Sequence, residues 1–262
     1  MLKAIIFDCD GVIVDSEPLH FKSFQMTLAD EEITLTQEEY NKTYLAMDDK
    51  GCFEAVLRQH RRLTDKAILK RLIHKKMALY RRFSQQELHI YRGVSDLVSK
   101  IKGKYYMAIA SGAFRGEIKF ALEQAGIRSA FSVIVSAQDV KQGKPHPESF
   151  LTALSKLNDL YGRPKPSNDL SLLGKGAPHL LPTGPTTPVL SEAAVTASLI
   201  MANECVVIED SVHGVAAARS AGMKSVAVTN SYSREQLLPF TDYVVDSLEE
   251  LTLNDLERLC KN

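Results

Sequence analysis

Two aspartates follow the first apolar run of the chain. Asp8 and Asp10 come directly after residues 3–7, which have the composition of a short buried strand. Gly11 comes next and allows a sharp turn without the steric cost of a Cβ atom. In open α/β sheets, ligands bind in the crevice outside the carboxyl ends of the strands. The spacing therefore predicts a site that begins at residue 8, although Asp-x-Asp-Gly alone also fits an ordinary turn.

Three segments further along the chain also end an apolar run with a reactive side chain. They are Met107 to Gly112 with Ser111, Gly143 to Pro145 with Lys144, and Val206 to Ser211 with Glu209 and Asp210. Phosphoryl transfer needs an in-line nucleophile, neutralisation of the phosphate charge and an acid for the leaving oxygen, and these side chains offer a candidate for each. Like charges about 4 Å apart repel by about 4 kcal/mol at an effective dielectric near 20, so four carboxylates beside a phosphate require a divalent cation. Oxygen-only ligands favour Mg²⁺.

In this order, the four segments resemble the haloacid dehalogenase superfamily of phosphotransferases. The resemblance covers nearly the whole chain except about residues 159–203. It implies that Asp8 is a nucleophile that forms an aspartyl-phosphate, and that Asp10 is the general acid and then the general base. It assigns Mg²⁺ to the Asp8 carboxylate, the Asp10 backbone carbonyl and Asp210. Glu209 either binds the ion directly or contacts the groups that do.

The resemblance also implies a phosphate-binding group. Ser111 and the backbone N–H groups near Gly112 are expected to hold a phosphoryl oxygen. Lys144 is expected to neutralise both the nucleophile and the phosphate. Because Asp10 supplies a proton donor, an ester substrate is favoured over a halide, whose departure needs no proton.

The fold expected is α/β, with a doubly wound, Rossmann-like parallel sheet in a catalytic core of residues 1–15 and 91–262. Helical periodicity predicts an inserted helical cap domain over residues 16–90, including a helix over about residues 65–82. Strands are expected near residues 105–110, 132–136, 205–208, 225–228 and 243–245, with helices over 116–124 and 212–221. Parallel strands with crossover helices bring their carboxyl ends to one edge, so the four motifs can meet there.

The cap residues help to distinguish between two possible reactions. The chain up to about Tyr80 resembles β-phosphoglucomutase, including His20 and Lys76. Those mutases carry a basic cap loop that binds a second phosphate, whereas this chain has Met47, Asp48 and Asp49 there. This substitution favours a phosphatase acting on a small sugar or polyol phosphate, with a phosphomutase as the alternative. Residues 49–51 are predicted to form a turn.

A phosphate-responsive regulator of the receiver type is the alternative from another functional class. Receivers also combine acids, a hydroxyl and a lysine on a doubly wound sheet. The helical insertion after the first strand and the general acid Asp10 argue against it. A small phosphate ester is therefore the expected partner.

The composition bounds the remaining possibilities. The 32 basic and 32 acidic residues give zero formal net charge, so no overall field favours nucleic acid or a membrane surface. No apolar run approaches the length that spans a bilayer. The four cysteines are widely scattered, which argues against a zinc site or a disulfide framework. The protein is expected to be cytoplasmic, and its oligomeric state stays open.

Residues 159–203 depart from the family pattern and predict an atypical insertion within the core. Residues 174–188 are rich in glycine and proline and indicate an irregular excursion. Ser191 is expected to cap a helix over residues 192–201. A link from a helix to a strand enters at the amino end of the strand, so the insertion is expected to lie away from the chemistry.

Overall fold

A parallel sheet forms the centre of the molecule. The structure is a computed structural model that describes residues 1–45, 47–162 and 199–261. Its six-stranded sheet has the order β5-β4-β1-β6-β7-β8, and every neighbouring pair is parallel. The strands are β1 Ala4–Phe7, β4 Tyr106–Ala110, β5 Val133–Val135, β6 Cys205–Glu209, β7 Lys224–Val228 and β8 Tyr243–Val245. The apolar runs predict each of these strands to within one residue at either end.

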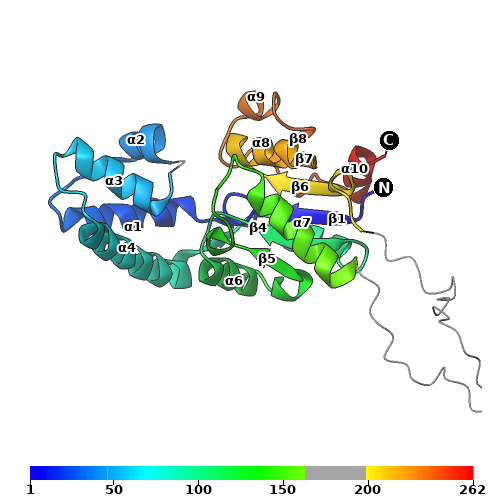
Figure 1. The fold of residues 1–262 in the computed structure, drawn as a ribbon, viewed down its shortest axis with the longest axis horizontal. Coiled ribbons are helices and arrows are strands. Elements are labelled where there is room, and N and C mark those ends of the chain that lie inside the picture. Colours follow the sequence, from blue (N-terminus) through cyan, green and yellow to red (C-terminus); the bar gives the residue numbers. More distant parts are fainter. Residues whose placement is uncertain (46, 163–198, 262) are drawn as a thin grey trace, which may run out of the picture.

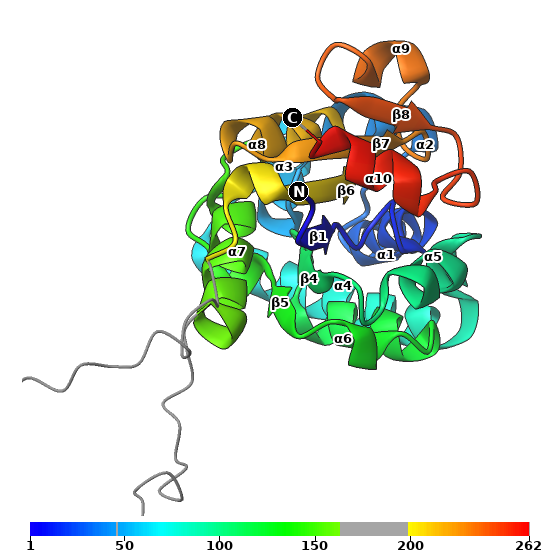
Figure 2. The ribbon, with the colours of Figure 1, turned by 90° about the vertical axis from the view of Figure 1, so that its right-hand side faces the viewer.

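Helices cover both faces of this sheet (Figure 2). Helices α5 (Val94–Ile101), α6 (Arg115–Gln124) and α10 (Leu253–Leu259) share one apolar cluster, whereas α7 (Glu148–Tyr161) and α8 (Val212–Ser220) share another. Successive side chains of β1 alternate between the two clusters, as the pleat of a strand requires. Because both faces are buried, the strands are apolar throughout. The predicted α/β fold with a doubly wound parallel sheet is confirmed. A short helix, α9 (Arg234–Leu237), follows β7.

A group of helices lies beyond the carboxyl edge of the sheet (Figure 1). These are α1 (Glu17–Ala29), α2 (Gln37–Glu39), a π-helical turn (Tyr40–Tyr44), α3 (Asp49–Gln59) and α4 (Lys66–Glu87). They enclose their own apolar cluster, with Phe24 from α1, Phe53 from α3 and Leu72 from α4. We refer to these helices as the cap helices. The proposed division between domains at residues 15/16 and 90/91 stays a prediction.

Two short strands carry the chain between the sheet and the cap helices. They are β2 (Val14–Asp15) and β3 (His89–Ile90), which pair antiparallel with Val14 opposite Ile90. The chain thus leaves the sheet and returns to it through adjacent segments. We refer to this pair of strands as the hinge.

Two predictions for the cap helices were wrong in detail. The segment Asp49 to Gly51 is not a turn but the first turn of α3, because the Asp48 side chain accepts a hydrogen bond from the Gly51 amide at 2.7 Å and so caps the helix. Helix α4 continues to Glu87, beyond the predicted end at Arg82. These additional residues carry the helix to the hinge, and Phe83 and Ser84 among them are buried.

The remaining expectations concern cysteines, membranes and the insertion. All four cysteines are buried and free, as their scattered positions predict. Within the described parts of the chain, no helix is long and apolar enough to cross a membrane. The cytoplasmic location stays a prediction. Of the predicted insertion, residues 163–198 lie outside the described residues, and most of the helix expected after Ser191 lies there with them.

Candidate active site

Asp8 and Asp10 lie at the carboxyl end of β1, near the centre of the sheet. The Asp8 amide donates to the Ile208 carbonyl at 2.9 Å, which continues the strand pairing past Phe7 and fixes the start of the loop. The Asp8 side chain is buried. The Asp10 carboxylate accepts hydrogen bonds from Ser16 Oγ at 2.5 Å and from Ser111 Oγ at 3.3 Å. Asp10 is therefore held both by the hinge side and by the strand β4 side of the site.

Lys144 reaches this edge from the loop before α7. Its Nζ lies 2.7 Å from Asp8 Oδ1 and also forms an ion pair with Glu209. Burial by itself would lower the pKa of Lys144, but the two carboxylates raise it above its ordinary value. The lysine is therefore protonated and can neutralise both Asp8 and a bound phosphate.

Three buried acids gather beside Lys144. Carboxylate oxygens of Asp8, Glu209 and Asp210 all lie within 4.8 Å of one another. Burial raises the pKa of Asp8 to about 7, Glu209 and Asp10 add to the rise, and Lys144 opposes it. Burial and the neighbouring acids also raise the pKa of Asp210. Repulsion among these oxygens exceeds what one lysine compensates, so the donor set fits a hard divalent cation such as Mg²⁺.

Glu209 is held by its own turn. One of its oxygens accepts hydrogen bonds from the Asp210 amide at 3.1 Å, the Ser211 amide at 3.3 Å and Ser211 Oγ at 3.1 Å, and the other pairs with Lys144. A Cβ atom on Gly214 would stand 1.9 Å from the carboxyl carbon of Glu209, so only glycine fits there. Because both of its oxygens are engaged, Glu209 is better placed to orient Lys144 than to bind an ion directly.

Two features of the structure require glycine at position 11. Its φ of 76° lies in the left-handed region, and a Cβ atom there would stand 1.9 Å from Asp210 Oδ2. Its carbonyl accepts a hydrogen bond from Asn230 Nδ2 at 2.7 Å. The glycine after the two aspartates thus lets Asp210 approach the loop that carries Asp8 and Asp10.

Ser111 follows β4 and faces the same loop. Its buried hydroxyl donates to Asp10 and accepts from the Ala113 amide at 3.1 Å. Gly112 is exposed beside it, and a Cβ atom there would meet nothing within 4 Å. Packing therefore does not require glycine at this position, although its small size leaves the backbone open to a ligand. The structure brings all six predicted core side chains, namely Asp8, Asp10, Ser111, Lys144, Glu209 and Asp210, to one edge of the sheet.

Three of the predicted cap residues meet around a buried lysine. Lys76 on α4 is only 1% exposed, and its Nζ lies 2.7 Å from Asp49 Oδ1 and 2.6 Å from His20 Nδ1. Burial, and then the charge of Lys76, lowers the pKa of His20 well below its ordinary value. His20 is therefore neutral, and its Nδ1 accepts from the lysine, which can only donate. Asp49 is the group that compensates the charge of Lys76.

The other two predicted cap residues do not join this cluster. Met47 is 43% exposed. The Asp48 carboxylate serves as the cap of α3, as described above. The two adjacent acids therefore have different structural partners, and their roles in specificity stay predictions.

Sequence reasoning missed three polar residues between the site and the cap helices. Ser16 holds Asp10, and Glu17 accepts a hydrogen bond from Tyr40 Oη at 2.5 Å. Glu117, in the first turn of α6, accepts from the Phe114 amide at 3.1 Å. Burial raises the pKa of both glutamates to about 7, and both lie close enough to Asp10 and Lys76 to feel their charges. Both glutamates lie in the first turn of a helix, where acidic residues are common, so no sequence signal marks them.

The family follows from a match over more than half of the chain. The profile described as haloacid dehalogenase-like hydrolase matches residues 5–160. The chain belongs to the haloacid dehalogenase-like hydrolases. A second profile, described as HAD-hydrolase-like, matches residues 141–251. The match confirms the resemblance carried by the four motifs, and it leaves the receiver-type regulator without support.

Curated relatives of this haloacid dehalogenase-like hydrolase are named as phosphatases. A putative phosphatase, YhcW, of Bacillus subtilis is 26% identical over 97% of this chain and 95% of its own length. A phosphorylated carbohydrates phosphatase of Thermotoga maritima is 26% identical over 60% of this chain and 71% of its own length. The prediction of a phosphoric monoester hydrolase is thereby confirmed.

Several solved structures share the fold of this chain. CbbY from Rhodobacter sphaeroides, in complex with phosphate, superposes with a TM-score of 0.75 at 22% identity and covers 98% of this chain and all of its own. A putative β-phosphoglucomutase from Thermotoga maritima superposes with a TM-score of 0.67 at 23% identity, over 98% of this chain and 99% of its own. At these identities the likeness concerns the fold alone.

Proposed function

We propose that this hydrolase is a magnesium-dependent phosphatase that hydrolyses a small phosphate monoester through an aspartyl-phosphate on Asp8. The observation that carries the proposal is the buried Asp8 carboxylate, which lies 2.7 Å from the protonated Lys144 and beside Asp210 in a cluster of oxygens. Asp8, Asp210 and the Asp10 backbone carbonyl are the groups that would hold Mg²⁺. The ion would neutralise charge on the phosphate and on Asp8.

In the first half of the reaction, an Asp8 carboxylate oxygen attacks phosphorus. The bond from phosphorus to the ester oxygen breaks, and the proton of Asp10 passes to that oxygen, so the alcohol leaves neutral. Lys144 remains protonated and neutralises the nucleophile and the transferring phosphoryl group. The products of this half are the free alcohol and a phosphoryl group bonded to Asp8.

In the second half, water replaces the alcohol. Asp10, now ionised, accepts a proton from the water as its oxygen attacks phosphorus. The bond to Asp8 breaks, which releases inorganic phosphate and restores both carboxyl groups. The hydrogen bond from Ser16 holds the Asp10 carboxyl group in place for both transfers.

The loop after β4, together with Lys144, supplies the groups that bind the phosphate. Ser111 Oγ, whose hydrogen bond to Asp10 is long at 3.3 Å, can turn to a phosphoryl oxygen. The exposed backbone at Gly112 and the ammonium group of Lys144 supply further donors. Ser111 and Gly112 directly follow the carboxyl end of β4, and Lys144 reaches the same edge, where open α/β sheets bind ligands.

The cap side favours a sugar or polyol as the alcohol part of the ester. His20, Glu17 and Glu117 are half-buried polar groups between the site and the cap helices, and neutral hydroxyls can both donate to and accept from such groups. The relative named as a phosphorylated carbohydrates phosphatase supports the same class. The expected substrate therefore carries hydroxyls and one phosphate.

A phosphomutase is the second candidate, because His20 and Lys76 are both present and meet in the structure. The Asp49–Lys76 ion pair speaks against it. A mutase must hold a second phosphate dianion on the cap side, but Asp49 already compensates the buried ammonium group of Lys76. We therefore rank hydrolysis above phosphate transfer between positions of a sugar.

The test combines a substrate screen with trapping of the intermediate. The protein with Mg²⁺ is assayed for phosphate release from sugar and polyol phosphates and, in parallel, for conversion of β-glucose 1-phosphate to glucose 6-phosphate. Acid quenching with ³²P-labelled substrate should leave label on the wild-type protein and none on Asp8→Asn. Asp96→Asn, an exposed aspartate on α5, is the matched control and should retain activity. Turnover by Asp8→Asn above about one per cent would move the nucleophile elsewhere, and rapid isomerisation would reverse the ranking.

A further inference from the structure

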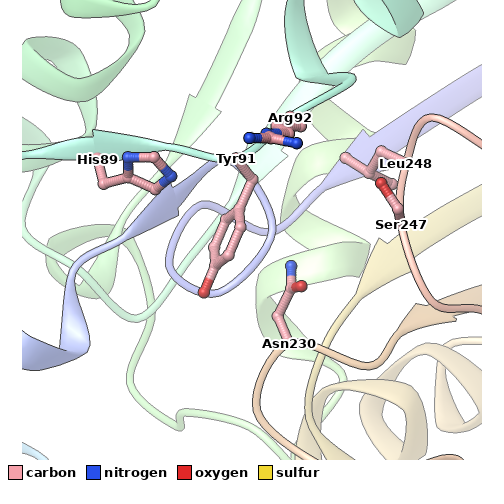
Figure 3. A pocket seen from close by; sticks show the side chains of 6 residues that line it. All are labelled: His89, Tyr91, Arg92, Asn230, Ser247 and Leu248. Atoms are coloured by element: carbon pink, nitrogen blue, oxygen red, sulfur yellow. The ribbon is translucent and has the colours of Figure 1, made fainter.

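A cavity of about 240 Å³ lies beside the hinge, apart from the catalytic acids. Figure 3 shows its six lining residues, which come from the hinge and from the loops that follow β7 and β8. They are His89, Tyr91, Arg92, Asn230, Ser247 and Leu248. None of the residues proposed for phosphoryl transfer lines it. We refer to this cavity as the hinge pocket.

The hinge pocket is lined by hydrogen-bond donors and lacks an acidic side chain. Arg92 has no hydrogen bond or ion pair with any other part of the chain that the structure describes. Asn230 uses its amide nitrogen on the Gly11 carbonyl, which leaves its second N–H without a partner among the described residues. The Ser247 hydroxyl accepts from the Glu249 amide at 3.2 Å, whereas its own donation to Glu249 Oε2, at 3.5 Å, is at the outer limit of a hydrogen bond, so its proton can turn to a ligand.

Two acids, Asp15 and Asp246, lie near the pocket without lining it. Burial, and then the charge of nearby Asp15, raises the pKa of the Tyr91 hydroxyl. Asp246 pairs with Arg234 at 2.8 Å and accepts from Thr229 at 3.1 Å. Neither acid forms an ion pair with the Arg92 guanidinium in the described part of the chain.

We propose that the hinge pocket binds a small organic anion through a carboxylate or phosphate group. The guanidinium fork of Arg92 matches the paired oxygens of either group. Ser247 and the free N–H of Asn230 add neutral donors, while the Tyr91 ring and Leu248 offer an apolar wall to the carbon skeleton. Carboxylates and phosphates share this chemistry, so the test includes one of each.

The walls of the pocket contact the loop that carries the catalytic aspartates. Besides the Asn230 contact with Gly11, the Tyr91 amide donates to the Ile13 carbonyl at 3.0 Å. An anion held by Arg92, Asn230 and Ser247 would tie the end of the hinge to both core loops. Amide signals of Gly11 and Ile13 should therefore report occupation, although neither residue lines the pocket.

The test is a site-resolved titration by ¹H–¹⁵N NMR with malonate and, separately, with inorganic phosphate. Each anion should produce saturable shifts at Arg92, Asn230 and Ser247. Arg92→Gln should weaken this binding at least about tenfold, the usual loss of a charged hydrogen-bond partner. Arg81→Gln is the matched control, since Arg81 is an exposed arginine on α4 and lies outside the pocket. Its dissociation constant should equal that of the wild type.

Location in the spectrum separates the hinge pocket from the active site, where phosphate should also bind. Saturation by malonate alone would assign the pocket to carboxylates, and saturation by phosphate alone would assign it to phosphates. Shifts confined to Ser111 and Gly112, or an unchanged dissociation constant in a folded Arg92→Gln variant, would overturn the proposal. Absence of saturable shifts from either anion up to about 50 mM, far weaker than ordinary metabolite binding, would do the same.

Discussion

Removal of the carboxylate that compensates Lys76 should destabilise the cap helices strongly. Asp49→Asn keeps the shape of the side chain but deletes the charge 2.7 Å from Lys76 Nζ. Breaking a buried ion pair on one side costs about 3–5 kcal/mol, because the other charge stays buried without a partner. The lysine is 1% exposed but Asp49 is 18% exposed, so water reaches one side of the pair. We therefore expect a loss of about 2–3 kcal/mol.

Asp48→Asn is the matched control. It removes the same formal charge one residue earlier, where the side chain caps α3 through the Gly51 amide. Asparagine is about as good as aspartate at the start of a helix, so the expected loss is below about 0.5 kcal/mol. The difference between the two variants isolates the ion pair from any general effect of charge on the cap helices.

The measurement is urea unfolding followed by far-ultraviolet circular dichroism, since the chain has no tryptophan. Hydrogen exchange in peptides of α4 reports local opening if the cap helices unfold before the core. Equal losses in the two variants, or a loss below about 1 kcal/mol in Asp49→Asn, would refute the argument that Asp49 compensates a buried charge. A second readout is kinetic: with Lys76 released, kcat/KM for a sugar bisphosphate relative to its monophosphate should rise about tenfold in Asp49→Asn only.

Four further predictions concern the core. Asp10→Asn should reduce turnover of an alkyl phosphate much more than that of an aryl phosphate, because the aryl leaving oxygen needs less protonation. Equal losses in the two assays would show that Asp10 is not the general acid. Gly11→Ala should cost about 2 kcal/mol or more in urea unfolding, because its Cβ would overlap Asp210 and its φ is 76°; a neutral result would mean that the loop can move away. Chelation with EDTA should abolish phosphate release and added Mg²⁺ should restore it, whereas activity that survives chelation would exclude the metal from the proposed reaction. Glu117 keeps its proton to about pH 7 when folded but only to about 4.5 when unfolded, so its contribution to the stability of the folded state falls as pH rises through that window, by at most about 3 kcal/mol. Asp8 and Glu17 add to the same slope, so Glu117→Gln should reduce the difference between unfolding curves at about pH 5 and pH 7.5 without abolishing it, and an unchanged difference would mean that Glu117 ionises freely.

The sequence predicts the core better than the cap because strand and helix patterns are local. Each strand is an apolar run that ends in a polar residue, so both the sheet and its catalytic edge can be inferred. The ends of α6 and α8 follow from Gly126 and Gly222, which have φ values of 69° and 73°. The four motifs meet because parallel strands align their carboxyl ends.

What the sequence could not provide depends on contacts between distant residues. The pair of Asp49 and Lys76 joins two helices, and nothing in the sequence near Asp49 indicates that its charge is engaged. Gly51 suggests a turn at the start of α3, whereas the hydrogen bond that the Asp48 carboxylate accepts from the Gly51 amide stabilises a helix there. Glu17 and Glu117 acquire their high pKa values from burial, which only packing reveals.

The pairing of β2 with β3 has a consequence for how this enzyme could be re-engineered. Val14 lies opposite Ile90 and Asp15 opposite His89, so the two ends of the helical insertion are about one strand spacing, roughly 5 Å, apart. A segment whose ends lie so close can be exchanged as a module. Any replacement, even a tight turn, needs only to begin and end at the same two paired positions. Specificity could thus be transplanted between relatives by cutting at these two paired positions, while the catalytic edge keeps its own strands.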